Sequence, residues 1–253
     1  MKFKLTLPLF IVAMFAWSCG NDDGSDTDTD TDTDVELSAA FEEFDTDNTN
    51  IYLDGSQVVI ETNGLPNHTS PYWSSTHALY VNPIVTTADD MAPGDIDDFN
   101  GSYTLRVSAN ASKASSTSST GLGAIGIAIS GSVIYNDQEG PNVPLDNAAP
   151  SLDYTGAHTG PQSYHYHLEP KAWSNDDTAL IGIISDGFFL YGRKCASTST
   201  YPTDLDESGG HTATTQHQSD TALYHYHIQN ELYLNQYYIL FPGNYQGTPN
   251  AIN

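Results

Sequence analysis

The chain has 253 residues, and its 32 acidic side chains outnumber the 7 basic ones, which gives a formal net charge of −25. Nucleic acid and anionic membrane surfaces are therefore poor partners, because both carry negative charge. Residues 35–253 are enough for one sizeable domain or two small ones.

The N-terminus has the features of an export signal. Lys2 and Lys4 precede an apolar run, residues 5–17, which is too short to span a bilayer and has the length of a signal-peptide core. The run ends in Ala-Trp-Ser-Cys, which resembles a bacterial lipobox with Cys19 as the lipidated residue. We expect residues 1–18 to be a lipoprotein-type signal peptide, and the protein to be exported and lipid-anchored at the outer membrane, facing the periplasm or the cell surface. An ordinary signal peptide cleaved near Ser18 would change the anchor and not the compartment.

After Cys19, an Asp-Thr repeat dominates residues 20–34. Like charges at this density predict an extended, disordered tether. Acidic residues directly after a lipidated cysteine resemble the surface-export signals of Bacteroidetes lipoproteins, although a solvated spacer explains them equally well. Cys195 is the other cysteine of the chain, so the mature protein can form no intrachain disulfide. We expect Cys195 to be a buried structural thiol rather than a ligand or nucleophile.

The remaining sequence predicts an all-β fold with few short helices. Helical periodicity is scarce, and the best helix candidate is the short segment 36–44. Runs rich in β-branched and aromatic residues, such as 58–62, 103–107 and 125–129, are separated by Gly, Pro, Asn, Asp and Ser. Residues 35–121 are expected to add strands to the same core.

Self-similarity predicts an internal duplication. Residues 125–135 align with residues 181–191, which lie 56 positions later, and residues 152–159 align with 205–212. A Tyr-His-Tyr-His segment then occurs in each copy, at 164–167 and at 224–227. Matches in the same order predict two repeats, at about 122–170 and 179–230, that pack with approximate two-fold symmetry. Each repeat would contain a strand, a turn, a second strand, a Gly-His loop and a Tyr-His-Tyr-His strand.

The histidines of these repeats predict a transition-metal site. Alternate residues of a strand point to the same face, so both histidines of each Tyr-His-Tyr-His segment share a face. An upstream histidine supplies a third nitrogen in each repeat, and three histidines with an open position are typical of a reactive metal site. Histidine ligation suits zinc, copper, nickel or iron rather than calcium or magnesium, and copper and zinc are the ions expected outside the cytoplasm. Whether each repeat holds its own ion or both share one site stays open at this stage. The predicted ligands are His158, His165, His167, His211, His225 and His227.

The same residues resemble the YHYH-domain proteins. The resemblance rests on Gly-x-His followed by Tyr-His-Tyr-His in both copies, on Asp-Gly-Phe-x-x-Tyr-Gly at 186–192, and on Asn-Gly-x-Pro-x-His at 63–68. It covers about residues 60–245 and implies an exported, often lipid-anchored, β-rich protein without an established reaction. The first repeat departs from the pattern, because it has Ser-Gly-Ser at 130–132 where the second has Asp-Gly-Phe.

Two further residues are secondary candidates. Asp186 could orient a histidine or act as a general base, although a turn aspartate before glycine is slightly favoured. His68 follows a turn and is as well explained by a loop histidine as by a further metal ligand. The sequence contains no glycine loop of the phosphate-binding type, so no motif points to a nucleotide cofactor.

These features favour a metal-binding protein of the cell envelope that captures, buffers or delivers copper or zinc. A metal-dependent hydrolase or copper oxidoreductase at the same histidines is the first alternative, so whether the protein is an enzyme stays open. A glycan-binding adhesion module in which the histidines are structural is the second. The only expected membrane contact is the N-terminal lipid anchor.

Overall fold

The computed structural model describes residues 35–83, 91, 94–160 and 163–253, so the predicted signal peptide and tether lie outside the described residues. Residues 35–253 form one compact unit. The prediction of a mainly β fold is confirmed, with predicted runs 58–62, 103–107 and 125–129 found in strands β2, β3 and β4. No helix in the described part of the chain is long and apolar enough to cross a bilayer.

The helix expected at 36–44 is only a short 3-10 helix, η1 (Ala39–Glu43). The Ser38 hydroxyl accepts a hydrogen bond from the Ala40 amide at 3.3 Å and caps its start. The helix ends at Glu43, because the backbone of Phe44 is already extended, and it is therefore too short to form a layer of its own. A second 3-10 helix, η3 (Ala149–Ser151), is shorter still.

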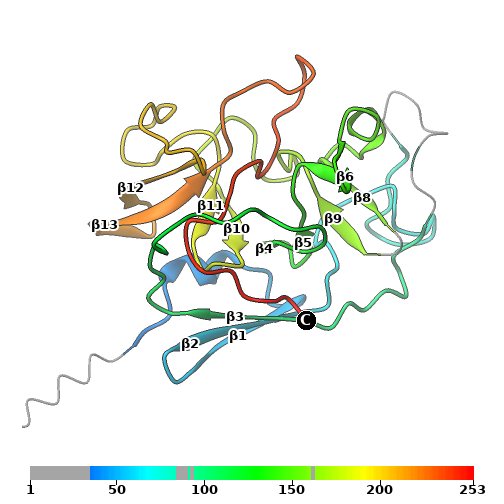
Figure 1. Ribbon diagram of the computed structural model, residues 1–253. Helices are drawn as coiled ribbons and strands as arrows, with labels where there is room; N and C mark the ends of the chain where they lie inside the picture. The colour runs from blue at the N-terminus through cyan, green and yellow to red at the C-terminus, as the bar shows by residue number, and fades with distance from the viewer. Residues whose placement is uncertain (1–34, 84–90, 92–93, 161–162) are drawn as a thin grey trace, which may run out of the picture. The chain divides into compact units, whose positions relative to one another are not determined.

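Two sheets form the framework (Figure 1). The smaller is an antiparallel sheet in the order β1-β2-β3, and β6 and β7 form a separate hairpin. The larger has eight strands in the order β12-β13-β11-β10-β4-β5-β9-β8. The bounds are β1 (Thr49–Asp54), β2 (Gln57–Thr62), β3 (Tyr103–Ser108), β4 (Gly126–Ala128), β5 (Val133–Ile134), β6 (Gln138–Gly140), β7 (Val143–Pro144), β8 (Ala157–Thr159), β9 (Tyr164–Tyr166), β10 (Leu180–Ile184), β11 (Phe189–Tyr191), β12 (Gly210–Thr215) and β13 (Gln218–His227).

The pairings of the larger sheet follow the same pattern outward from its centre. On one side β10 pairs antiparallel with β11, β11 pairs parallel with β13, and β13 pairs antiparallel with β12. On the other side β4, β5, β9 and β8 repeat these three relations in the same order. This is the strand order that the proposed duplication requires; descent of the two halves from one unit stays a prediction.

The two halves meet at an antiparallel contact between β4 and β10, and glycines make this contact close. A Cβ atom on Gly182 would lie 2.2 Å from the Ile127 carbonyl oxygen, and one on Gly126 would lie 2.6 Å from the Ile183 carbonyl oxygen. Any larger residue would therefore force the strands apart. Each glycine occupies the same place in its half of the sequence alignment.

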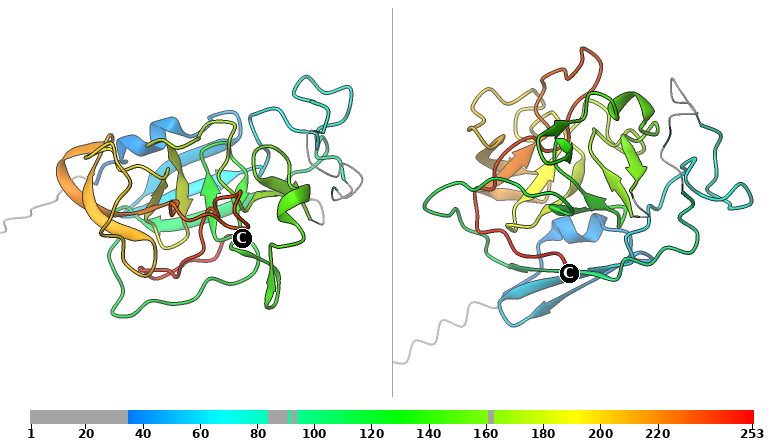
Figure 2. Two further views of the ribbon diagram at one scale, coloured as in Figure 1. Left: turned by 90° about the horizontal axis from the view of Figure 1, so that it is seen from above. Right: turned by 45° about the vertical axis from the view of Figure 1, so that its right-hand side comes forward.

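Both faces of the larger sheet are covered by apolar side chains. One face packs on β2 and β3, where Val58, Ile60 and Leu105 meet Ile127 and Ile183. The smaller sheet lies below the larger one in Figure 1 and in the right-hand view of Figure 2. Tyrosines of β9 and β13 pack into a second cluster with the C-terminal segment around Phe241. Burial on both faces explains why every residue of β10 is buried.

Candidate metal centres

Strand register places the upstream histidines beside the Tyr-His-Tyr-His segments. His158 on β8 is the direct partner of His165 on β9, and His211 on β12 is the direct partner of His225 on β13. Directly opposed residues of an antiparallel pair have neighbouring side chains on the same face. The centroids of the paired rings lie 4.6 Å apart in the first pair and 4.9 Å apart in the second.

A glycine turn before each upstream histidine sets this register. Gly156 has a φ of +77°, and a Cβ atom there would lie 2.8 Å from the Leu168 carbonyl oxygen. Glycine alone adopts this conformation without strain in so little space. Gly209, at the matching place in the second half, has a φ of +79°. In both turns, glycine therefore allows the loop to approach the neighbouring strand closely.

The first centre consists of His158, His165 and His167, each of which contributes a ring nitrogen within 4.8 Å of the others. All three side chains are buried. Glu139 on β6 approaches two of the three rings, because its Oε1 atom lies 3.4 Å from His158 Nε2 and 3.5 Å from His167 Nε2. The carboxylate is not part of the group whose ligand atoms all lie within 4.8 Å of one another. Ligands of a tetrahedral zinc ion with bonds of about 2.0–2.1 Å are about 3.3 Å apart. The carboxylate therefore lies near this ligand separation from two of the three histidines.

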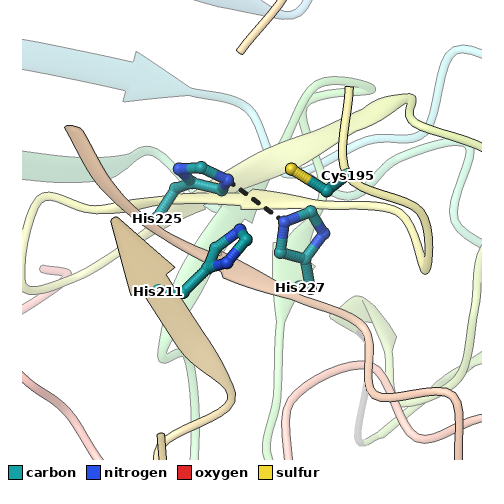
Figure 3. Close-up of side chains that lie close together, drawn as sticks. All are labelled: Cys195, His211, His225 and His227. Carbon is teal, nitrogen blue, oxygen red and sulfur yellow. Dashed lines mark hydrogen bonds between the residues drawn. The ribbon is translucent and has the colours of Figure 1, made fainter. Parts of the chain in front are cut away.

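The second centre consists of His211, His225 and His227 together with Cys195, whose ligand atoms again lie within 4.8 Å of one another (Figure 3). The close-up shows the Cys195 sulfur directed from a neighbouring segment toward the histidine rings. His225 Nε2 and His227 Nε2 are 3.1 Å apart, close to the tetrahedral ligand separation of about 3.3 Å. Buried His and Cys groups of this kind could hold a metal ion.

Backbone contacts fix which ring nitrogen faces each centre. His225 Nδ1 lies 2.9 Å from the Leu223 carbonyl oxygen, and His227 Nδ1 lies 2.7 Å from that of Gly192. A carbonyl oxygen only accepts hydrogen bonds, so both Nδ1 atoms carry the hydrogen and donate. The corresponding atoms of the first centre do the same, since His165 donates to Ser163 at 2.9 Å and His167 to Asn136 at 2.6 Å. Each ring therefore presents the lone pair of Nε2 inward, as in the outer-sphere arrangement of known metal sites.

With the hydrogen on Nδ1, the Nε2 lone pairs of neighbouring rings face one another. In the neutral state, neither His225 Nε2 nor His227 Nε2 has a hydrogen to place in the 3.1 Å between them. His211 Nδ1 is engaged by Asp204 Oδ1 at 2.8 Å, and no hydrogen-bond partner among the described residues reaches the buried Nε2 of His211. In the first centre, the His167 Nε2 lone pair faces the Glu139 carboxylate. A cation between the ligand atoms would satisfy all of these groups at once.

Protonation of the buried histidines does not supply this positive charge near neutral pH. Burial lowers the pKa of His158, His167 and His225 to about 4, and that of His227 to about 3. Burial also holds the pKa of His165 well below its ordinary value, and a charge on the neighbouring His167 would lower it further. These five rings are therefore neutral at pH 7, which is the state that binds metal.

The two centres are separate. The first lies on β8 and β9 at one edge of the larger sheet, and the second lies on β12 and β13 at the other edge. Five strand spacings separate β9 from β13, which corresponds to about 20–25 Å. The question of one shared site or two, open from the sequence, is thus answered by two distinct groups of side chains.

The tyrosines point to the opposite face and hold the strands in the core. Tyr164 OH donates to Asp153 at 2.5 Å, and Tyr224 OH donates to Asp206 at 3.0 Å, so each half uses an aspartate of its glycine turn. Tyr135 stacks on His165 with ring centroids 3.8 Å apart and so covers the first centre from the neighbouring strand. The alternation of the motif therefore separates the candidate ligands from the core residues.

Asp186 and His68 belong to the tyrosine face. Asp186 accepts hydrogen bonds from Tyr226 OH at 2.5 Å and from the Gly247 amide at 2.9 Å. His68 Nδ1 donates to the Thr69 carbonyl, and its Nε2 accepts from Tyr166 OH at 2.6 Å, so neither nitrogen is free for an ion. The structure brings neither residue to a histidine cluster. The Ser130 hydroxyl contacts Tyr166 at the place where Asp186 contacts Tyr226, which gives the Ser/Asp difference between the halves a structural meaning.

Two residues of the centres were not predicted as ligands. Cys195 is buried, as expected, but its sulfur lies with three ring nitrogens rather than in an apolar core. Glu139 was not considered. Both follow their aligned strands at the same point of the alignment, since Glu139 comes four residues after Tyr135 and Cys195 four residues after Tyr191. That matched position was the available signal.

Comparison with known proteins identifies the domain. Residues 104–204 match the family model described as YHYH protein. Neither the curated proteins nor the solved structures include a match to the chain. The matched segment contains the complete first histidine centre and Cys195, whereas the second Tyr-His-Tyr-His segment follows it. Residues 104–204 are therefore a YHYH domain, as the sequence resemblance predicted.

Proposed function

We propose that this protein is an exported, lipid-anchored protein of the cell envelope that binds copper or zinc at two histidine centres and captures, buffers or delivers the ion. The location is supported by the basic start, the apolar run and the lipobox-like sequence before Cys19. The acidic tether would let the domain extend from the membrane into the surrounding compartment.

One observation supports the metal function most strongly. In each centre, buried imidazoles have their Nδ1 atoms committed to the backbone and turn Nε2 toward a common point, with His225 and His227 only 3.1 Å apart. Structural histidines in a core normally satisfy both nitrogens by hydrogen bonding, as His68 does. His165, His167, His225 and His227 instead have the orientation that metal-binding histidines have.

Elemental analysis tests this function directly. Full-length protein, purified from the envelope of cells that export it, should contain close to one copper or zinc ion per centre. His165→Ala combined with His225→Ala should abolish this content, while His77→Ala should preserve it, because His77 stacks on Trp73 away from both centres. Metal-free wild-type protein that also fails to take up zinc or copper(I) in dialysis would refute the proposal. Release of Cys19→Ala protein from the membrane fraction would test the anchor separately.

A metal-dependent enzyme is the second candidate, because a pocket of about 340 Å³ lies against the second centre. His225 forms part of its wall together with apolar and aromatic side chains that include Phe188 and Leu223. A pocket of this size can admit a small organic molecule. If the second centre is hydrolytic, zinc-loaded protein should cleave a chromogenic ester. His225→Ala should abolish this activity and His165→Ala should retain it. Equal rates in both variants and in metal-free protein would dismiss the enzyme.

A further inference from the structure

We propose that the two centres bind different metals: the Cys195 centre takes copper(I), and the Glu139 centre takes zinc(II). This inference rests on the proposed metal-binding function and extends it to the division of labour between the two halves of the sheet. It explains why two centres with matching histidines have a different donor beside them.

The difference is confined to one place. Glu139 and Cys195 stand at the 56-residue offset that aligns the two strand pairs, and both follow a tyrosine that contacts a histidine of the centre. The histidine positions, the strand register and the backbone contacts of the matched rings agree between the centres. The fourth donor is therefore the main chemical variable.

The chemistry of this donor changes which metal ion the site prefers. A thiolate is a soft ligand that binds copper(I) and zinc(II) alike, whereas a carboxylate is a hard ligand that binds zinc(II) and holds copper(I) poorly. Only the Cys195 centre therefore has a donor that suits copper(I), which leaves the zinc(II) for the Glu139 centre when both ions are present. Three imidazoles are compatible with either ion. Copper(I) binding requires Cys195 to release its thiol proton to the solvent, and no electron is transferred when the metal is supplied as copper(I).

The environments of Cys195 and Glu139 also favour copper(I) and zinc(II), respectively. Cys195 is 1% exposed, and its sulfur lies 3.1 Å from the Ser197 hydroxyl, which can donate to a thiolate. His211 brings to this centre a buried Nε2 without a hydrogen-bond partner among the described residues, and Asp204 orients its ring from the other side. The Glu139 side chain is 27% exposed on the β6–β7 hairpin, where solvent can reach the ion. A closed thiolate site retains copper(I), and a more open carboxylate site admits zinc with water.

Competition titrations on the full-length protein test the inference. Copper(I) is supplied anaerobically against a chromophoric copper(I) chelator, and zinc(II) against a chromophoric zinc chelator. In the wild type we expect one ion of each to bind when both are present. Cys195→Ser should weaken copper(I) binding by more than the 10–100-fold typical of losing an outer-sphere partner, and leave one zinc site. Glu139→Gln should weaken zinc at the first centre and leave copper(I) affinity unchanged.

A spectroscopic and a gain-of-function measurement complete the design. Cobalt(II) placed in both centres should give a thiolate-to-metal charge-transfer band that Cys195→Ser abolishes and Glu139→Gln retains. Glu139→Cys should create a second tight copper(I) site, a result that misfolding cannot produce. Equal copper(I) affinities at both centres, or no effect of Cys195→Ser in a protein with unchanged near-ultraviolet circular dichroism, would overturn the inference. If two ions still bind and each is lost with its own histidines, the metal-binding function survives that result.

Discussion

Replacing His225 should remove one ion and leave the other in place. His225 contributes to the second centre alone, and about 20–25 Å of sheet separates that centre from His165. Substitutions that far apart usually have additive effects. His225→Ala should therefore lower the metal content from two ions to one, and His165→Ala should do the same at the other edge.

The magnitude follows from binding linkage. At a free metal concentration 100 times the dissociation constant, each centre stabilises the folded state by about 2.7 kcal/mol. For a domain of the size of residues 35–253, each kcal/mol shifts Tm by about 2–4 °C. Metal should then raise the Tm of each single variant by about 5–11 °C, and that of the wild type by about twice as much. Comparing each protein with and without metal cancels the packing cost of losing the ring.

Calorimetry with elemental analysis of the same samples is the appropriate assay, with His77→Ala as the control because its ring lies on Trp73. Loss of both ions in either single variant would mean that the histidines serve one shared site. An unchanged metal-induced Tm shift in His225→Ala would mean that the second cluster binds no ion.

Three further results are expected. Asp186→Ala should destabilise the fold by about 1–3 kcal/mol, because the Tyr226 hydroxyl and the Gly247 amide lose their acceptor. The variant should keep its metal, and loss of metal would contradict the position of Asp186 on the tyrosine face. Metal-free protein should lose stability as the pH falls from about 6.5 toward 4, because burial lowers the pKa of His158, His167 and His225 to about 4 and the unfolded chain binds more protons in this range. Each of these three histidines contributes up to about 1.4 kcal/mol per pH unit, and a urea midpoint that stays constant across this range would contradict the prediction. Gly156→Ala should cost at least about 1–2 kcal/mol, given a φ of +77° and contact with Leu168, and should weaken only the first centre; Gly121→Ala, with nothing within 4 Å, is the matched control in urea titration.

The alternation of the Tyr-His-Tyr-His segments was enough to predict that His165 and His167 share a face. This inference needs only the two-residue period of a strand, which is local geometry. The turn residues between the apolar runs likewise predicted the mainly β fold, because a turn residue acts on the backbone within a few positions of itself. The short helix was overestimated, since apolar residues around Phe41 pack against the sheet without needing a regular α-helix.

The composition of each centre depended on tertiary structure. Glu139 and Cys195 reach their clusters from separate segments, and nothing in their immediate neighbours indicates where those segments pack. The same holds for Asp186 and His68, whose hydrogen bonds to tyrosines depend on contacts between distant parts of the chain. Sequence periodicity determined the direction of the histidine side chains. The packing of loops against the sheet edges decided that there are two centres, that Cys195 lies in one of them and that Glu139 lies beside the other.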